Sequence, residues 1–277
     1  MRHLKKRNPS VITSGIFHNV DPHESFPLSR TLTRKLLTST DLPVLLSSQT
    51  TTEAARLKPD NQALTLFHPV YERPDPDANR SEIRRRYGVG DNELMYLFYG
   101  LVRPYKGLDL LIDALNQLDL RENNIKVVVA GEFYTRKEPL LSQISEKTRP
   151  NIHLEDRFIG NREADELLFA SDVMLLPYRS ASQSGILADA INFRLPVICS
   201  DQPGFTDVIT HQKHGWIFPS EDTEALKQAI TTLTDDRLRA EFFRNLSDLK
   251  EELSWDRFTQ NLFHQLEQRY KKHKSTY

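Results

Sequence analysis

Two positively charged side chains lie three residues apart in a glycine-flanked segment, Gly100-Leu101-Val102-Arg103-Pro104-Tyr105-Lys106-Gly107. Arginine binds phosphate oxygens through two parallel donors, lysine supplies a compact charge, and glycine lets the backbone approach a ligand closely. The segment lies between a strand-like run and a helical pattern, and open α/β sheets bind ligands beyond the carboxyl ends of their strands. These residues fit a phosphate site and equally a solvent-exposed turn, because short loop motifs have low specificity.

A second candidate segment, Tyr178-Arg179-Ser180-Ala181-Ser182-Gln183-Ser184-Gly185-Ile186, follows the strand-like run at residues 173–176 and enters another predicted helix. A hydroxyl residue and a glycine suit N-capping there, and they also leave backbone N–H groups that can bind an anion. Asp189 lies one turn further, where its carboxylate can accept hydrogen bonds from a ribose diol. Plain capping with a surface aspartate is the alternative, and these residues alone favour it.

A third polar segment, Phe17-His18-Asn19-Val20-Asp21-Pro22-His23-Glu24, follows another strand-like run. Two histidines and two carboxylates suggest metal ligands, but His18 and His23 lack the i, i+4 spacing of ligand pairs on a helix. A polar loop that reaches into a cleft is therefore favoured over a metal site. The chain contains no G-x-G-x-x-G, G-x-x-x-x-G-K-[ST] or G-x-S-x-G, so nothing supports a Rossmann dehydrogenase, a P-loop NTPase or an α/β-hydrolase.

Alternating strand-like and helical stretches must position these segments. Nearly continuous apolar runs predict strands, and apolar spacings of three and four residues predict helices. The expected strands are residues 11–17, 44–46, 64–67, 94–99, 126–130, 152–154, 173–176 and 196–199, and the expected helices are 108–118, 163–170, 186–193, 224–233 and 255–270. The alternation predicts an α/β fold with parallel sheets and helices on both faces.

A proline-rich polar stretch, HPVYERPDPDAN at residues 68–79, divides the chain. Three predicted strands precede it and at least five follow it. We therefore expect a small unit before the stretch and a complete open sheet after it.

The composition excludes several classes of protein. The 277 residues include 37 Lys and Arg against 38 Asp and Glu, and 38% are hydrophobic, which is ordinary for a soluble globular chain. A net charge of -1 gives no general attraction to nucleic acid, and no apolar run approaches the roughly 20 residues of a membrane span. The single cysteine, Cys199, excludes an intrachain disulfide framework and suits a reducing cytoplasm.

In order along the chain, these segments resemble the family 4 (group 1) glycosyltransferases of the GT-B fold. The resemblance rests on LMYLFYGLVRPYKGLDLLIDAL, IKVVVAGE, FIGNREADELLFASDVMLLPYRSASQSGILADAINFRLPVICSDQPGFTDVI and HGWIFPSEDTEALKQAI. These stretches cover about residues 93–233 and match the donor-binding domain of that family. GIFHNVDPHE, HPVY and SWDRFTQNLFHQLEQRY resemble segments of its acceptor domain and of the helix that crosses back to it.

The resemblance implies three parts. Residues 1–78 would be a partial, acceptor-side Rossmann-like domain, 79–253 the nucleotide-sugar-binding domain, and 254–277 a helix that crosses back to the first domain. The N-terminal domain is expected to be incomplete, because its three strands match only the second half of the family's sheet. Self-association through residues 11–67, or a partner chain that supplies the other half, would cover the exposed edge.

The resemblance also implies which residues bind the donor diphosphate. Arg103 and Lys106, beside Gly100, would neutralise the diphosphate of a nucleotide-sugar and would act as the catalytic cations. The N–H groups of residues 184–186 would hold the same diphosphate at the start of a helix.

Further roles follow from the same resemblance. Asp189 would hold the ribose, and it matches the second acidic residue of the family's E-x7-E motif. Ala181 stands where the first acidic residue of that motif is expected. Phe158 and Ile159 would lie against the base, and His18 would face the donor sugar as a further catalytic residue.

The expected function is transfer of a sugar from a nucleoside-diphosphate sugar to a glycan, lipid or small-molecule acceptor in polysaccharide biosynthesis. The resemblance implies retention of the anomeric configuration, with no metal and no other cofactor. The alternative is a non-catalytic nucleotide-sugar-binding subunit, or a truncated remnant, that needs another chain. A GT-B epimerase or phosphorylase fits the residues less well.

The expected location is the cytoplasm. The basic start MRHLKKR also suits a peripheral position at an anionic membrane, although a solvated end is the favoured explanation.

Overall fold

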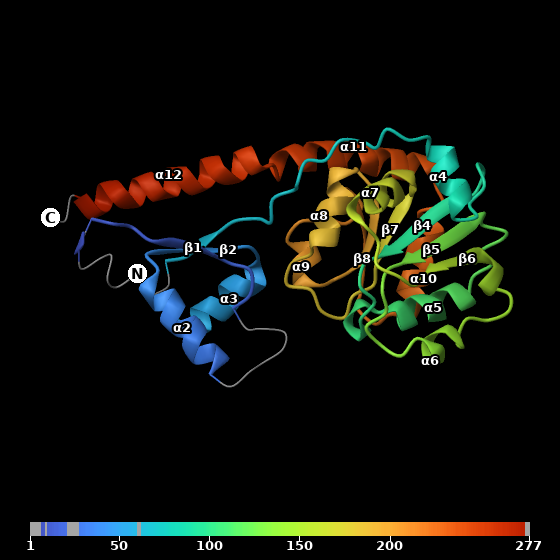
Figure 1. Ribbon diagram of the computed structural model, residues 1–277, viewed down its shortest axis with the longest axis horizontal. Helices are drawn as coiled ribbons and strands as arrows, with labels where there is room; N and C mark the ends of the chain where they lie inside the picture. Colours follow the sequence, from blue (N-terminus) through green and yellow to red (C-terminus); the bar gives the residue numbers. More distant parts are fainter. Residues whose placement is uncertain (1–6, 9, 21–27, 60–61, 275–277) are drawn as a thin grey trace. The chain divides into compact units, whose positions relative to one another are not determined.

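The computed structural model describes residues 7–8, 10–20, 28–59 and 62–274 of the chain (Figure 1). The chain forms two compact units. The smaller unit consists of Met1–Pro69 together with Glu252–Tyr277, and the larger unit is Val70–Glu251. The boundary after Pro69 lies inside the proline-rich stretch 68–79.

A three-stranded parallel sheet forms the centre of the smaller unit. Its strands are β1 (Ser14–Phe17), β2 (Leu42–Leu45) and β3 (Leu64–Thr65), in that order, joined by helices α2 (Ser29–Ser39) and α3 (Ser48–Leu57). Every residue of β2 is buried, as expected for a central strand covered on both faces. On one face, Phe17, Leu37 and Ala54 meet in a small core. The three strands predicted before residue 68 are confirmed.

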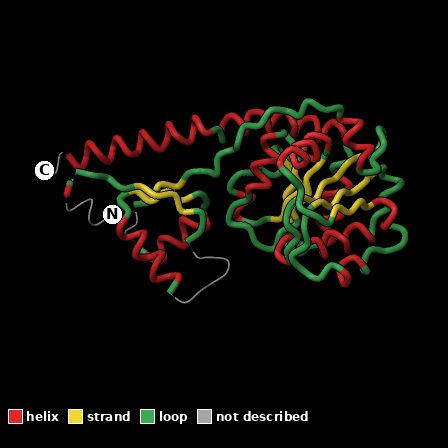
Figure 2. The backbone as a smooth tube through the Cα atoms, in the orientation of Figure 1, coloured by secondary structure: helices red, strands yellow, loops and turns green. Residues whose placement is uncertain are grey.

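Helix α12 (Trp255–Lys274) belongs to the smaller unit, although most of the chain separates it from the sheet. Its Phe258 packs against Val44 and Leu46, which alternate with the buried Leu45 and so lie on the other face of the sheet. The helix appears as a long red coil in Figure 2. The predicted helix over residues 255–270 is confirmed and extends by four residues to Lys274.

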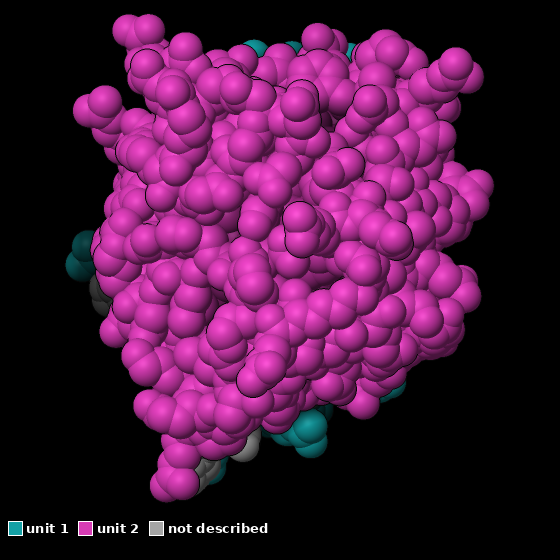
Figure 3. Space-filling model, turned by 90° about the vertical axis from the view of Figure 1, so that its right-hand side faces the viewer, with its two compact units in different colours: residues 1–69, 252–277 teal, residues 70–251 magenta. Residues whose placement is uncertain are grey.

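The larger unit is built on an open, six-stranded parallel sheet, and one face of its surface is shown in magenta in Figure 3. In spatial order its strands are β6 (Ile152–Glu155), β5 (Ile125–Ala130), β4 (Leu94–Tyr99), β7 (Val173–Leu176), β8 (Val197–Ser200) and β9 (Gly215–Phe218). Its helices are α4 (Arg80–Arg86), α5 (Leu108–Asn116), α6 (Glu138–Leu141), α7 (Asn161–Ala170), α8 (Gly185–Asn192), α9 (Pro203–Thr206), α10 (Thr223–Thr232) and α11 (Asp236–Glu252).

Helices cover both faces of this sheet, with α5 and α10 on one side and α7 and α8 on the other (Figure 1). Successive strand residues point to opposite faces, so alternate residues of the central strands build each layer of the core. Tyr96 and Phe98 of β4 pack with Val127 of β5 against Leu111 of α5 and Leu226 of α10. The predicted α/β architecture with doubly covered parallel strands is confirmed.

The order of the strands reverses direction between β4 and β7, which pair in parallel at Tyr96↔Val173 and Leu97↔Met174. Loops that leave the carboxyl ends of two such strands diverge to opposite faces of the sheet, and the crevice between them is where open α/β sheets bind ligands. The segments singled out in the sequence, residues 100–107 and 178–186, follow β4 and β7. The topology therefore places both segments at the reversal point.

Several elements lie outside the sequence-based prediction. The expected strands 94–99 and 173–176 agree with β4 and β7 at both ends, and four expected helices correspond to α5, α7, α8 and α10. Strand β9 and helices α2, α3, α4, α6, α9 and α11 are not predicted. None of the helices in the described chain has both the length and the hydropathy to cross a bilayer.

Candidate functional site

The loops that follow β4 and β7 meet at Gly100. Its φ is +98°, and a Cβ built on it would lie 2.6 Å from Ile186 Cδ1 and 2.9 Å from Lys106 Nζ. A larger residue at this position would displace both side chains, so the site depends on glycine here. The structure therefore brings together one residue from each predicted phosphate-binding segment.

A single turn of 3-10 helix, Pro104–Lys106, positions the lysine. The turn ends at Gly107, whose φ of +70° is left-handed. A Cβ on Gly107 would lie 2.0 Å from the backbone oxygen of Pro177, the residue that follows β7. Only glycine permits this approach, and the close contact fixes the turn against the end of β7.

Lys106 is a buried cation, with only 5% of its surface exposed. Its Nζ lies 5.5 Å from the centre of the Tyr178 ring, and in the part of the chain that the structure describes it forms no ion pair with a carboxylate. Burial, with a smaller contribution from the charge of Arg103, lowers the pKa of Lys106 to about 8. A buried ammonium group without a counter-ion favours the binding of an anion.

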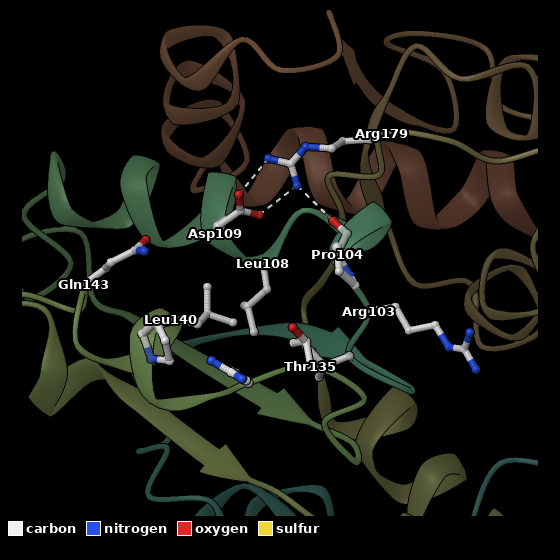
Figure 4. A pocket seen from close by; sticks show the side chains of 11 residues that line it. Arg103, Pro104, Leu108, Asp109, Thr135, Leu140, Gln143 and Arg179 are labelled. Carbon is white, nitrogen blue, oxygen red and sulfur yellow. Dashed lines mark hydrogen bonds and ion pairs between the residues drawn. The ribbon is translucent and has the colours of Figure 1, made fainter.

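Arg103 precedes the same turn and is half-buried. Its guanidinium carbon lies 5.1 Å from the centre of the Tyr134 ring. The backbone around Arg103 borders a cavity of about 230 Å³, but its side chain extends away from the other labelled side chains of that cavity (Figure 4). The predicted pair of cations is thus split between a buried lysine and a more accessible arginine.

Arg179, which follows β7, holds the cation loop in place. It donates two hydrogen bonds to the Asp109 carboxylate at 2.8 and 2.7 Å and a third to the Pro104 oxygen at 2.9 Å (Figure 4). Its backbone N–H also donates to the Tyr105 oxygen at 2.7 Å. The Arg179 guanidinium keeps the pKa of Asp109 below its usual value. The sequence does not reveal this function of Arg179, because its partner Asp109 lies 70 residues away in the chain.

The N-terminus of α8 forms the other side of the site. The Ser184 side chain caps the helix by accepting a hydrogen bond from the Leu187 N–H at 3.2 Å, so the predicted capping is confirmed. Gly185 and Ile186 occupy the first turn, where backbone N–H groups have no acceptor within the helix. No other acceptor among the described residues receives these two N–H groups. They are available to an anion, and the helix dipole favours negative charge at this end.

Asp189 lies on the next turn of α8, three residues beyond Ile186 and on the same face of the helix. Its carboxylate pairs with the guanidinium of Arg73. Burial raises the pKa of Asp189, while the charge of Arg73 lowers it. Asp189 is predicted as a site residue from the sequence, whereas its partner Arg73, 116 residues earlier, is not.

A family model described as "Glycosyl transferases group 1" matches residues 79–248, which include both loops and α8. The chain belongs to the group 1 glycosyltransferase family. The resemblance stated from the sequence is therefore confirmed at the level of this family.

Two relatives illustrate the extent of the similarity. Alpha-D-kanosaminyltransferase of Streptomyces kanamyceticus is 25% identical over 178 residues, which make up 63% of this chain and 45% of that protein. The GDP-mannose-dependent alpha-(1-6)-phosphatidylinositol monomannoside mannosyltransferase of Mycobacterium tuberculosis is 27% identical over 230 residues, or 77% of this chain and 58% of that protein. The chain spans about half the length of the curated relatives it matches.

Solved structures share the fold of this chain. Sucrose-phosphate synthase from Thermosynechococcus elongatus has a TM-score of 0.74 at 15% identity, with 94% of this chain and 68% of that chain covered. Anabaena Alr3699/HepE in complex with UDP-glucose has a TM-score of 0.76 at 16% identity, with 92% and 72% covered. The predicted GT-B type α/β fold class is confirmed by this likeness.

The two residues predicted to contact the base differ in exposure. Both lie between β6 and α7. Phe158 is 70% exposed, whereas Ile159 is 5% exposed and belongs to the core. An exposed aromatic ring is accessible to a base, but the structure does not bring Phe158 together with Lys106 or Ile186.

His18 belongs to the smaller unit, where it follows β1. The centre of its ring lies 6.2 Å from that of His68, edge to face, and His68 Nδ1 lies 3.0 Å from the Pro69 oxygen. Burial is the main cause that lowers the pKa of His68. The other predicted site residues all belong to the larger unit.

The possible metal ligands of the His18 segment extend beyond the described chain. Asp21, His23 and Glu24 lie outside the described residues. Elsewhere, within the described ranges, no group of three or more His, Cys, Asp or Glu side chains is placed to hold a metal ion.

Proposed function

We propose that this group 1 glycosyltransferase chain transfers a sugar from a nucleoside-diphosphate sugar to a glycan, lipid or small-molecule acceptor. The observation that carries the proposal is the meeting of buried Lys106 with the N-terminus of α8 across Gly100. A buried ammonium group and two N–H groups without acceptors in the described chain suit the two phosphates of such a donor.

The proposed reaction requires stabilisation of a leaving diphosphate. The bond from the anomeric carbon to the diphosphate oxygen breaks, and an acceptor hydroxyl oxygen bonds to that carbon. The proton of that hydroxyl passes to the leaving diphosphate or to solvent. Negative charge therefore develops on the diphosphate. Lys106, Arg103 and the positive end of α8 would stabilise that charge as fixed groups, without a metal ion. Retention of configuration is a further part of this proposal and rests on the family resemblance.

The rest of the donor would extend along the same edge of the sheet. Asp189, one turn beyond the helix start, suits the ribose hydroxyls, and the exposed ring of Phe158 suits the base. His18 is proposed to face the donor sugar. Structures of Anabaena Alr3699/HepE contain UDP and UDP-glucose, which supports a nucleotide-sugar donor for this chain.

The proposed acceptor class follows from the names of relatives. They include the lipopolysaccharide glucosyltransferase WaaG of Escherichia coli and the putative teichuronic acid biosynthesis glycosyltransferase TuaC of Bacillus subtilis. Both names refer to glycans, so we propose a glycan or lipid-linked acceptor. We also propose that the chain acts in the cytoplasm or at the cytoplasmic surface of a membrane.

Calorimetric titration with UDP, GDP and ADP tests the donor site. One nucleotide should bind to the wild-type chain. The double variant Arg103→Ala/Lys106→Ala should weaken that binding at least about tenfold, because it loses the hydrogen bonds of two charged side chains to the diphosphate. Arg136→Ala is the matched control, since Arg136 is an exposed arginine near the same loop. Binding that is unchanged in the double variant would overturn the proposed site.

A second candidate function is nucleotide-sugar binding without transfer. Ala181 favours it, because this buried alanine stands where the family's first acidic residue is expected. A donor hydrolysis and transfer assay separates the two functions. Nucleotide binding without turnover, with glycan and lipid-linked acceptors supplied, would favour a binding subunit.

We also propose that the smaller unit associates with a second copy or another chain. Strand β1 lies at the edge of the described sheet, and its Ile16 is 45% exposed. Edge strands with exposed apolar side chains tend to pair unless they are covered. A monomer by light scattering at high concentration would contradict self-association.

A further inference from the structure

Arg73 belongs to the polar segment that follows Pro69, and its backbone is fixed although the segment has no regular secondary structure. The Arg73 N–H donates to Asn192 Oδ1 at 3.1 Å, and Asn192 Nδ2 donates back to the Arg73 oxygen at 3.1 Å. Asn192 is 1% exposed and ends α8. These two reciprocal hydrogen bonds hold the backbone of Arg73 against the end of α8.

The Arg73 guanidinium lies between two carboxylates on neighbouring helices. Its two terminal nitrogens each lie 2.5 Å from one acid, Asp165 of α7 and Asp189 of α8. The three side chains are only 21–29% exposed, and the guanidinium lies 5.5 Å from the centre of the Phe193 ring. Partial burial reduces solvent screening, so this cation strongly affects both acids.

The pairing engages only one oxygen of Asp189. Arg73 donates to Oδ1, and no donor in the described part of the chain reaches Oδ2. Ile186, which is three residues earlier on the same helix face, packs towards Gly100. Asp189 therefore presents an oxygen without a protein donor, next to the place where the diphosphate is proposed to bind.

The charges around Asp189 oppose one another. Burial and the nearby Asp165 raise the pKa of Asp189, and Arg73 lowers it. Tyr99 at the end of β4 also interacts electrostatically with Asp189. Without the guanidinium, two half-buried acids would face each other, and one of them would take up a proton at higher pH.

We propose that Arg73 is a positioning residue of the nucleotide site, which keeps Asp189 ionised and turns its Oδ2 towards the ribose hydroxyls of the donor. This inference rests on the proposed function. It makes the segment after Pro69 part of the donor site, although the family resemblance gave that segment no role in binding.

The decisive experiment compares a nucleoside diphosphate with its 2′,3′-dideoxy analogue, using the nucleotide that the wild-type chain binds. Arg73→Gln should weaken binding of the ribonucleotide on the order of tenfold and leave binding of the dideoxy analogue unchanged, because only the ribonucleotide has hydroxyls for Asp189. Arg73→Lys should restore part of the loss, since lysine keeps the charge but cannot bridge two carboxylates with a planar fork.

Arg194→Gln is the matched control. Arg194 donates to both carboxylate oxygens of Asp75 at 3.0 Å, and Asp75 belongs to the same polar segment as Arg73. Arg194 is not paired with Asp189. If Arg73 only braces the segment, the Arg73 and Arg194 variants will alter the binding of both nucleotides equally. That result would overturn the proposal.

A second measurement does not depend on nucleotide binding. Carbon-13 NMR of the Asp189 carboxyl group should show a higher pKa in Arg73→Gln than in the wild-type chain, and no change in Arg194→Gln. An unchanged Asp189 titration would overturn the role of Arg73 even if no nucleotide binds. A wild-type chain that binds none of the nucleotides, but shows the shift in Arg73→Gln, would instead contradict the proposed function.

Discussion

Gly107 and Pro177 approach each other so closely that a single added carbon at Gly107 would lie 2.0 Å from the Pro177 oxygen. The contact joins the end of the cation loop to the end of β7. Gly107 needs two properties of glycine at once, because its backbone is in the left-handed conformation and a side chain has no space there.

Gly107→Ala should destabilise the larger unit by about 2–4 kcal/mol, because it combines left-handed strain with a backbone clash. Gly88→Ala isolates the first contribution. Gly88 has a nearly equal φ of +69°, but nothing lies within 4 Å of its Cβ position, so we expect a loss of only about 1 kcal/mol. Urea unfolding measures both values, and equal losses would show that the contact with Pro177 is unimportant.

The lowered pKa of Lys106 predicts a pH dependence of stability. Its pKa is about 8 in the folded protein and 10.5 in the unfolded chain, so the unfolded chain binds more protons between these values. The free energy of unfolding should therefore rise from pH 8 to 10.5, relative to Lys106→Met, by about 3 kcal/mol. Below pH 8 the full penalty of the buried charge applies, and Lys106→Met should be the more stable protein.

Urea unfolding at several pH values measures the difference in free energy of unfolding between wild type and Lys106→Met. Lys213→Met, at an exposed lysine, is the control, and its difference from wild type should not change with pH. A gap between wild type and Lys106→Met that is constant with pH would contradict a lowered pKa. Saturation with the bound nucleotide should remove the pH dependence, since a diphosphate would stabilise the charged lysine.

Arg179→Gln should loosen the loop that carries Arg103 and Lys106. It removes the paired hydrogen bonds to Asp109 and the one to the Pro104 oxygen, and we expect a loss of about 1–3 kcal/mol in stability together with weaker nucleotide binding. Glu221→Gln is the control, because Glu221 is the exposed partner of Arg179 and such pairs contribute about 0–1 kcal/mol. If Arg179→Gln binds the nucleotide as tightly as wild type, the hydrogen bonds of Arg179 are not needed to position Arg103 and Lys106 for binding.

Phe258→Ala should destabilise the smaller unit by about 3–5 kcal/mol, because it leaves a cavity under the sheet. Phe258 is 2% exposed, whereas Phe263 on the same helix is 63% exposed, so Phe263→Ala should change little. Hydrogen exchange of β2 amides reports on this unit separately from the larger one. Equal protection of β2 in the two variants would contradict the packing of α12 on the sheet.

The sequence predicts the central part of the fold well. Strands β4 and β7 are short, nearly continuous apolar runs, and their shortness favours buried strands over helices. Strand β9 escapes prediction because it begins with Gly215, a residue that disfavours strands. The structure requires that glycine, since a Cβ there would lie 2.4 Å from the Val197 oxygen. Helix α11 has buried Phe242, Leu246 and Leu249 at spacings of three and four residues, and this spacing is the signal that predicts a helix there.

The residues of the candidate site also divide into those that local sequence patterns reveal and those that depend on distant partners. Gly100, Lys106 and the capping Ser184 are local features, which the spacing around a strand end or a helix start reveals. Arg73 is not local, because its two acidic partners come from helices that fold about 90 to 120 residues later in the chain. A single sequence contains no trace of such a pairing. The predicted roles of His18, Phe158 and Ile159 stay predictions, as do the donor-binding roles of the other site residues.

The smaller unit takes its residues from both ends of the sequence, with Val70–Glu251 between them. Phe258, which covers the second face of β2, therefore leaves the ribosome only after the whole larger unit has left it. Domains usually fold in the order in which they are made. Here the order is reversed, because the first strands wait with one apolar face open while the later unit folds. Chaperone binding during translation should therefore concentrate on the segment that contains β1 to β3.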